Sequence, residues 1–416
     1  MKRSNNQDSF AVDLAGDAEA WQERGHLFLV ADGMGAHAAG ELASRLAAEK
    51  IPQLYRKYRD VSPPEALQKA VIETNSEVNR RGEANADFHH MGTTCSVLTM
   101  LPQGAVLAHI GDSRIYRLRG GQLEQLTFDH SLVWEMRAAG QLPEGSQLAN
   151  SVPKNVITRS LGPNANVKVD LEGPFPLEVG DTFLLCSDGL SGQIDDEEMA
   201  PLLATLTPQE AVRVLVDLGN LRGGPDNITV IIARVVGPGI TTAMAGGEPI
   251  TIGAKKVDRS VHPVLWGVMG ACFLAALGMA ALQQWILGLV FGVVGLGTLG
   301  YILYLLKSSP TRGGVVLPVG KHLGKGPYTQ TSCQATPEFV ETLAGVVEHL
   351  RKSARDAGWE INWSLADKHV EAAEVAAKSA KYAEAVRAYA NTISFMMDEV
   401  RSLRQQRKAS DSSIEL

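Results

Sequence analysis

The sequence of 416 residues lacks a long basic run, and its net charge of −7 does not favour a nucleic-acid partner. Its four cysteines lie far apart and form no CxxC pair, so neither a zinc site nor a disulfide framework is indicated. A reducing compartment fits this cysteine usage best. The first ten residues are polar and lack the apolar core of a signal peptide, so we expect no secretory leader.

Charge is also missing from residues 260–306, which contain no Asp, Glu, Lys or Arg. Gln283 and Gln284 divide this stretch into residues 264–282 and 285–306, and each part reaches the roughly 20 residues needed to cross hydrocarbon. A buried helical hairpin of a soluble protein is the alternative interpretation. Basic residues flank the pair on both outer sides while the connecting turn is uncharged, so the positive-inside rule predicts a two-pass membrane protein with both termini in the cytoplasm. The flanking residues are Lys255, Lys256, Arg259, Lys307 and Arg312.

This hairpin divides the chain into a globular region, a linker, the hairpin, a second linker and a helical tail. We place them at residues 1–236, 237–261, 262–306, 307–336 and 337–408. The tail is rich in Ala, Glu, Lys and Arg, and its apolar residues recur at helical spacing. One segment is similar to part of a tetratricopeptide helix pair, but stacked repeats need about three units. An ordinary helical hairpin or coiled coil is therefore the alternative for the tail.

The globular region groups its strands and helices rather than alternating them strictly. Several strands are closely spaced and joined by turns, which indicates an antiparallel arrangement. The expected strands are residues 27–31, 93–101, 105–110, 114–118, 182–187 and 228–236. Helix starts with a capping box and a proline at the first position occur at residues 62–65 and 207–210. These patterns predict an α+β fold rather than a doubly wound parallel sheet.

Four aspartates stand beside glycine or asparagine where an apolar run ends or the chain turns. They are Asp32, Asp112, Asp188 and Asp226. A single Asp-Gly pair is most often turn chemistry, so each alone is weak evidence. If the four converge, they form an oxygen-only site of the kind that suits Mg²⁺ or Mn²⁺ better than zinc or copper. Two such ions can share one carboxylate and activate a water for attack on a phosphoryl group.

The surroundings of these aspartates resemble the metal-dependent serine/threonine protein phosphatases of type 2C, the PPM family, in its bacterial form. The matching segments occur in the family's order from residue 3 to about residue 236. They are RSNNQD at 3–8, VADGMGAH at 30–37, MGTT at 91–94, HIGDSR at 109–114, LTFDHS at 126–131, NVITRSLG at 155–162, LCSDGL at 185–190 and GPDNIT at 224–229. Alanine at position 36 departs from the glycine that the family usually carries there.

The resemblance implies a role for individual residues of this chain. Asp32 would bridge two metal ions, with the carbonyl of Gly33 as a further ligand. Asp188 and Asp226 would complete the first metal site. Asp8 would help to hold the second ion, and Asp112 with Asp188 would bind a third. The expected cofactors are thus two or three Mn²⁺ or Mg²⁺ ions, between which the sequence does not choose.

The remaining implied roles concern the substrate. Arg3 would bind the substrate phosphate, since the planar guanidinium suits phosphate oxygens. Asn227 would orient the loop that carries Asp226. His37 is a candidate proton donor, with turn capping as its alternative. Residues 131–150 resemble the flap that influences substrate choice in this family. His109 and Cys186 are interpreted as packed core residues rather than as a ligand and a nucleophile.

For residues 3 to about 236 the resemblance implies a four-layer α-β-β-α sandwich of two antiparallel sheets flanked by helices. The transmembrane hairpin and the helical tail, expected from hydropathy and periodicity, follow it. The implied activity is hydrolysis of phosphoserine and phosphothreonine on proteins at the cytoplasmic face of a membrane. A membrane-bound Ser/Thr kinase is an expected counterpart, and the tail is a candidate site for a protein partner. The rival hypothesis is a weak or inactive signalling adaptor that keeps the phosphatase fold and recruits a partner through the tail.

Overall fold

The computed structural model describes most of the chain. The described residues are 5–35, 38–142, 152–153, 155–242, 249–252, 255–256, 263–307, 311–312, 315–317, 321–359 and 361–412. Two predicted site residues, Arg3 and His37, lie outside them, as do residues 143–150 of the predicted flap. The chain forms two compact units. The first comprises Met1–Lys57, Leu67–Glu248 and Val319–Leu416, and the second comprises Tyr58–Ala66 and Pro249–Pro318.

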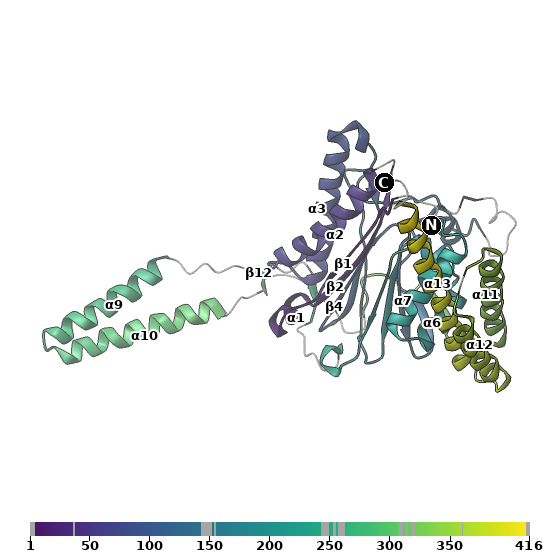
Figure 1. Ribbon diagram of the computed structural model, residues 1–416. Coiled ribbons are helices and arrows are strands. Elements are labelled where there is room, and N and C mark those ends of the chain that lie inside the picture. The colour runs from purple at the N-terminus through teal and green to yellow at the C-terminus, as the bar shows by residue number, and fades with distance from the viewer. Residues whose placement is uncertain are drawn as a thin grey trace. The chain divides into compact units, whose positions relative to one another are not determined.

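The first unit contains two antiparallel sheets (Figure 1). One has the order β1 (Asp8–Asp13), β2 (His26–Met34), β4 (Cys95–Leu101), β5 (Gly104–Ile110) and β8 (Asp170–Phe175), and β3 (Gly92–Thr93) pairs with β2. The other has the order β10 (Val230–Arg234), β9 (Thr182–Cys186), β6 (Arg114–Arg119), β7 (Gln122–Gln125) and β15 (Thr329–Ser332). All six strands expected from the sequence are present, but the one expected at 93–101 is divided at Thr94 into β3 and β4, and the one expected at 228–236 is shortened to β10.

Helices cover the outer faces of the two sheets (Figure 1). On the first sheet they are α2 (Ala39–Lys57) and α3 (Pro63–Ala84), which share a small apolar cluster. On the second they are α6 (Asp196–Thr205) and α7 (Pro208–Leu221). The capping box that begins α7 forms, because Thr207 and Glu210 exchange hydrogen bonds. The expected sandwich of two antiparallel sheets between helices is confirmed.

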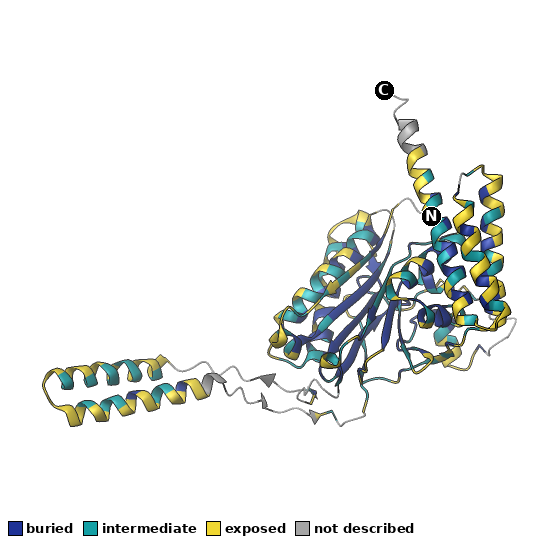
Figure 2. Ribbon diagram, turned by 60° about the horizontal axis from the view of Figure 1, so that its bottom comes forward, coloured by how far each residue is buried: buried dark blue, intermediate teal, exposed yellow. Residues whose placement is uncertain are grey.

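Shorter helices occupy the connections between these elements. They are α1 (Ala18–Arg24), η1 (Ala86–Phe88), α4 (Leu132–Ala138), α5 (Asp188–Ser191) and η3 (Pro238–Ile240). The core between the sheets is formed by alternate residues of the facing strands, including Val30, Leu98, Leu107, Phe183 and Leu185, all of which are fully buried. Figure 2 shows that the strands of both sheets are mostly buried. Because successive strand residues point to opposite faces, one face of each strand fills this core and the other meets helices.

The C-terminal helices belong to the same unit as the sandwich. They are α11 (Pro337–Asp356), α12 (Trp363–Lys378) and α13 (Tyr382–Ser412). Their apolar faces join α6 and α7 in one buried cluster, to which Leu343, Tyr389 and Ile393 contribute from the tail and Leu203 and Leu215 from the sandwich. Arg401 also pairs with Asp217 of α7 at 2.5 Å. The apolar face of the tail is therefore occupied by the sandwich.

Part of the segment expected to be a linker, residues 307–336, is instead a strand of the second sheet. β15 pairs with β7, with Thr329 opposite Gln125 and Ser332 opposite Gln122. Its residues are polar, and strand prediction looks for apolar alternation, so its sequence gives no strand signal. It forms a strand because its backbone pairs with the edge of β7.

The second unit contains a pair of apolar helices, α9 (Pro263–Ala281) and α10 (Trp285–Lys307). Two short strand pairs belong to it, β11 (Thr251–Ile252) with β14 (Val315–Val316) and β12 (Lys255–Lys256) with β13 (Thr311–Arg312). By length and composition both helices could cross a membrane. Their residues are mostly exposed or half-buried (Figure 2).

Candidate active site

The first two predicted aspartates lie opposite each other on neighbouring strands. Asp8 at the start of β1 is the register partner of Asp32 in β2. The backbone of Asp32 is fixed on its other side, because its N–H donates to Thr94 Oγ1 at 2.8 Å and its carbonyl accepts from Thr93 Oγ1 at 2.9 Å. The pairing of two strands and the two threonines thus place both carboxylates at the same edge of the first sheet.

Asp8 also connects the two sheets. Its Oδ2 accepts hydrogen bonds from Ser187 Oγ and from Thr229 Oγ1, each at 2.8 Å. Ser187 follows β9 and Thr229 precedes β10, so both donors belong to the second sheet. The other oxygen, Asp8 Oδ1, is buried and has no hydrogen-bond partner among the described residues. One oxygen therefore fixes the side chain while the second stays available to a ligand.

Asp188 is placed by a close crossing of two loops. It is the first residue of α5, one residue beyond Ser187, which follows the end of β9. A Cβ atom on the next residue, Gly189, would lie 1.9 Å from the carbonyl oxygen of Asn227, so the loop with Asp226 can approach only a glycine. Asp188 Oδ1 is a second buried carboxylate oxygen for which the described residues provide no partner.

Asn227 ties the Asp226 loop to the segment before β1. Its N–H donates to Asp226 Oδ1 at 2.8 Å, and its own Oδ1 accepts from the N–H of Gln7 at 3.0 Å. Asn227 is 4% exposed, so these bonds form away from bulk water. This geometry fits the orienting role expected for Asn227, and it fixes the loop relative to Asp8.

Gly33 lies where three backbone segments meet. Its N–H donates to the carbonyl of Gln7 at 3.1 Å. A Cβ atom at this position would lie 2.2 Å from the carbonyl oxygen of Gly40 and 2.5 Å from that of Gln7. Any larger residue would push β1 or α2 away, so glycine is required here for packing. The expected metal ligand at this position is the backbone carbonyl.

Asp112 lies in a turn that two histidines hold by hydrogen bonds to Gly111. Gly111 has φ +110°, which favours glycine, and its N–H donates to His130 Nδ1 at 3.0 Å. The Gly111 carbonyl lies 2.9 Å from His109 Nε2 and accepts from the N–H of His130 at 2.8 Å. Asp112 Oδ1 is buried without a partner in the described residues. His109 is 1% exposed and fully hydrogen-bonded, as expected of a packed residue.

Burial and mutual repulsion raise the pKa of these carboxyls. For Asp32 desolvation is the largest cause, and the charges of Asp188, Asp8 and Asp112 add to it. For Asp8 desolvation again dominates over the opposing hydrogen bonds from Thr229 and Ser187. Desolvation and the Asp188 charge raise the pKa of Asp112 to about 7. The carboxylates are thus close enough to oppose one another's ionisation.

This arrangement fits a hard divalent cation. Three buried carboxylate oxygens without a donor, on groups that repel each other, are stabilised by an added positive charge. Within the described ranges no three or more His, Cys, Asp or Glu side chains are grouped so that they could hold a metal ion by themselves. Mg²⁺ keeps several waters and takes only one or two carboxylates directly, so an incomplete protein ligand set is in keeping with such an ion.

Three polar residues of the site were not predicted as contributors. They are Ser187 and Thr229, which hold Asp8, and His130, which holds the Asp112 turn. Each lies within one of the motif segments quoted above, next to or near a predicted ligand. Proximity in the motif was an available signal, but only the fold shows that these side chains point to Asp8 and Gly111.

Comparison with known proteins gives consistent matches. A family model described as protein phosphatase 2C matches residues 2–217. The serine/threonine phosphatase stp of Listeria monocytogenes is 37% identical over 213 residues, which are 50% of this chain and 84% of that protein. Protein phosphatase PhpP of Streptococcus pneumoniae is 37% identical over 242 residues, which are 56% of this chain and 94% of that protein.

A solved structure gives a similar match. It is described as the catalytic domain of the serine threonine protein phosphatase PstP in complex with two manganese ions. It is 34% identical, covers 57% of this chain and 94% of that chain, and has a TM-score of 0.48. The family match ends at residue 217, before the hairpin and the C-terminal helices.

Proposed function

The chain belongs to the protein phosphatase 2C family and is a serine/threonine protein phosphatase, and on that premise we propose that it dephosphorylates phosphoserine and phosphothreonine at the cytoplasmic face of a membrane. The observation that carries the catalytic part is the set of buried carboxylate oxygens without donors on Asp8, Asp112 and Asp188. The observation that supports the membrane part is the pair of apolar helices α9 and α10.

The metal site would be formed by Asp32, Gly33, Asp188 and Asp226, with Asp8 and Asp112 toward the further ions. Proteins of this family use Mn²⁺ or Mg²⁺. When bound, such ions lower the pKa of water and neutralise charge on a phosphoryl group. The protein itself supplies fixed oxygen positions, and it keeps them fixed through β-sheet pairing and hydroxyl donors rather than through flexible side chains.

Three further residues belong to the proposed mechanism. Arg3 would bind the phosphate oxygens of the substrate with its planar guanidinium. Asn227 is a positioning residue, because its two hydrogen bonds fix the Asp226 loop against Gln7. His37 stays a candidate proton donor.

The proposed location rests on charge as well as on hydropathy. Basic residues stand before α9 and after α10, whereas the turn at Gln283 and Gln284 is uncharged. By the positive-inside rule both flanks then face the cytoplasm, together with the phosphatase region and the tail. At a membrane surface the phosphatase would meet proteins phosphorylated by a membrane-bound Ser/Thr kinase, which is the class of enzyme that must supply its substrate.

Phosphate release from a phosphothreonine peptide in the presence of Mn²⁺ tests the catalytic proposal. We expect the wild type to be active, Asp188→Asn to be inactive, and Asp87→Asn to keep wild-type activity. Asp87 is a matched control, because it is an exposed aspartate on η1 away from the carboxylate cluster. A wild type that releases no phosphate with either Mn²⁺ or Mg²⁺ would refute the enzyme and favour the adaptor hypothesis.

Topology needs a separate measurement. A reporter that is active only in the cytoplasm, fused after Leu416, should be active in cells. A reporter active only after export, fused at the same residue, should be silent. The opposite pattern would overturn the two-pass topology without affecting the catalytic proposal.

A further inference from the structure

The chain that follows the second unit returns to the sandwich as a strap, which we define as residues 321–332. The N–H of Leu323 donates to the Gly173 carbonyl of β8 at 2.6 Å. Further along, the N–H of Tyr328 donates to the Gln125 carbonyl of β7 at 2.8 Å, and β15 continues this pairing. β8 belongs to the first sheet and β7 to the second, so the strap crosses from one sheet to the other.

A buried glutamate on β8 is the centre of this crossing. Glu172 is 3% exposed and accepts hydrogen bonds from the N–H of Gly326 at 2.9 Å and from the Tyr328 hydroxyl at 2.5 Å. A Cβ atom on Gly324 would lie 2.1 Å from the Glu172 carboxylate, so a larger residue here would displace that side chain. Two glycines and a tyrosine thus form a specific seat for Glu172.

A chain of aromatic contacts leads from Tyr328 to helix α4. The Tyr328 ring packs on Phe128 with centroids 5.5 Å apart, and Phe128 packs edge-on against Trp134 of α4 at 5.4 Å. The guanidinium of Arg114 covers the Trp134 ring at 5.6 Å. The position of α4 therefore depends on a ring that the strap contributes.

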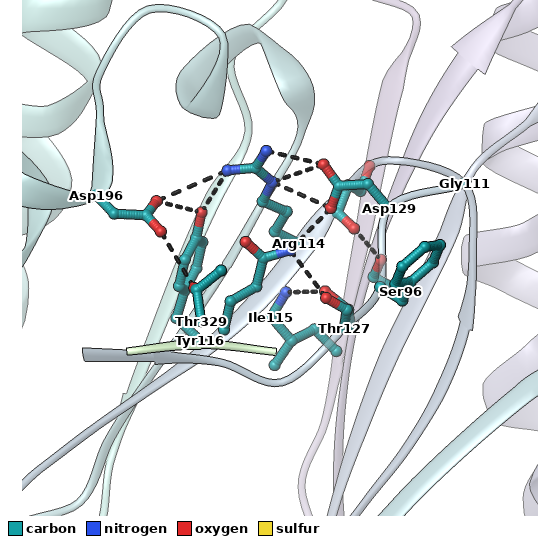
Figure 3. A network of polar contacts seen from close by, with 12 residues as sticks. Ser96, Gly111, Arg114, Ile115, Tyr116, Thr127, Asp129, Asp196 and Thr329 are labelled. Carbon is teal, nitrogen blue, oxygen red and sulfur yellow. Dashed lines mark hydrogen bonds and ion pairs between the residues drawn. The ribbon is translucent and has the colours of Figure 1, made fainter. Parts of the chain in front are cut away.

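A polar connection starts from the neighbouring residue of the strap (Figure 3). Thr329 Oγ1 lies 3.4 Å from Asp196 Oδ2. Asp196 Oδ1 accepts from the Tyr116 hydroxyl at 2.8 Å and lies 3.7 Å from Arg114 Nη1. Arg114 in turn donates to both oxygens of Asp129. The strap thus reaches the segment 128–134 from two sides.

We propose that Tyr328 is a positioning residue that holds α4 in place, through Phe128 and Trp134, for binding of the polypeptide part of the substrate. This proposal rests on the proposed phosphatase function. α4 begins two residues after His130, whose N–H donates to the carbonyl of Gly111 beside Asp112. The outer residues of α4 are exposed, so a polypeptide bound beside the carboxylates meets this helix. A small phosphate ester reaches only the carboxylates.

The test compares a phosphothreonine peptide with p-nitrophenyl phosphate in the full-length protein. Loss of one ring contact in Tyr328→Leu should raise KM for the peptide about three- to tenfold. The kcat/KM for p-nitrophenyl phosphate should stay within about twofold of the wild type, because the carboxylates are untouched. Tyr328→Phe keeps the ring and should stay closer to the wild type. Gln330→Ala is the control, since Gln330 is an exposed strap residue.

A second variant keeps the test decisive if Tyr328→Leu does not fold. Trp134 is half-buried and lies at the other end of the contact chain. Trp134→Leu should therefore raise the peptide KM in the same way. The double variant should have a peptide KM no higher than either single variant, because both substitutions break the same chain of ring contacts. A folded Tyr328→Leu or Trp134→Leu with wild-type peptide KM, or with equal losses on both substrates, overturns the role of the strap. A wild type inactive on both substrates instead overturns the proposed function.

Discussion

Two groups of buried or half-buried aspartates lie side by side in this sandwich and differ in their partners. The first group, Asp8, Asp32, Asp112 and Asp188, contains buried oxygens without donors, and its charges oppose one another. In the second group, Asp129 receives a two-pronged contact from Arg114 at 2.8–3.1 Å, and Asp196 receives the Tyr116 hydroxyl. The residue type and the burial are similar, and only the neighbouring groups differ.

This difference separates a binding site from a structural network. Buried carboxylates without counter-charges reduce the stability of the fold unless a ligand neutralises them. Paired carboxylates fix the strands and loops that carry the first group. His109 connects the two, because its Nε2 lies 2.9 Å from the Gly111 carbonyl before Asp112 and 3.0 Å from the Phe128 carbonyl before Asp129.

Removing one acid of the first group should have the largest effect, and only on activity. We expect Asp32→Asn to lower Mn²⁺-dependent phosphate release by about a thousandfold or more, since the ion would lose the ligand proposed to bridge the metal sites. In metal-free buffer the variant should melt at the wild-type temperature or above it, because one repelling charge is gone. A lower metal-free melting temperature would show that Asp32 is structural, and the contrast between the groups would fail.

Removing the cation of the second group should act on stability. Arg114→Met leaves Asp129 buried without its main partner and should lower the free energy of unfolding by about 3–5 kcal/mol. Urea unfolding at pH 7 measures this loss. The double variant with Asp129→Asn should recover part of it, because no unpaired charge then remains. An unchanged free energy of unfolding in Arg114→Met would contradict the prediction, because Asp129 would then not depend on Arg114 as its partner.

The residue between the two groups should give the protein a pH dependence. Burial, with the nearby His130, lowers the pKa of His109 to about 3. The folded protein therefore keeps His109 neutral while the unfolded chain binds a proton below about pH 6.5. The stability contribution is present above that pH and is lost as the pH falls toward 3, by up to about 1.4 kcal/mol per unit.

Urea unfolding of the wild type and of His109→Gln between pH 7.5 and pH 4.5 measures this effect. Glutamine can hydrogen-bond but does not titrate, so the variant should show a flatter profile. Parallel profiles for the two proteins would contradict the prediction. They would indicate that His109 is protonated in the folded state.

The tail repeats the paired arrangement at a more exposed place, with the smallest expected effect. Asp217 of α7 is buried and accepts from Ser394 and Arg401 of α13. Arg401→Met should lower the free energy of unfolding by about 1–2 kcal/mol, because Ser394 still satisfies one oxygen of Asp217. Thermal melting with Arg401→Lys as the control measures it. An unchanged melting temperature in both variants would show that this pair adds nothing to tail docking.

Much of the sandwich could be predicted because its strands are apolar and its turns contain glycine. The strands β2, β5, β6 and β9 and the helix starts at Ser62 and Thr207 all follow from local pattern. β1 was missed, since Asp8 and Asp13 at its ends and the exposed Phe10 and Val12 within it do not resemble a core strand. β15 was missed for the same reason, because polar edge strands are defined by their partner rather than by their own residues.

The predicted ligands Asp8, Asp32, Gly33, Asp112, Asp188 and Asp226 are placed by loops and strand ends that the motifs also mark. Local sequence marks such positions, because aspartate and glycine next to each other at the end of a strand favour a turn of the chain. The supporting hydroxyls of Ser187 and Thr229 could not be assigned from sequence. They are 179 and 221 residues from Asp8, and only the closing of the two sheets brings them within 2.8 Å of it.

By itself the sequence determined the residue chemistry of this protein: its family, the acidic residues proposed as metal ligands, and a charge-free stretch long enough for two apolar helices. Tertiary structure decided which acids are paired and which are left for a ligand, and it turned residues 329–332 and the tail helices into parts of the phosphatase unit. The reason is physical. Residue type and local pattern are properties of neighbours in the chain, whereas charge pairing and edge-strand addition depend on groups that meet only after distant segments pack.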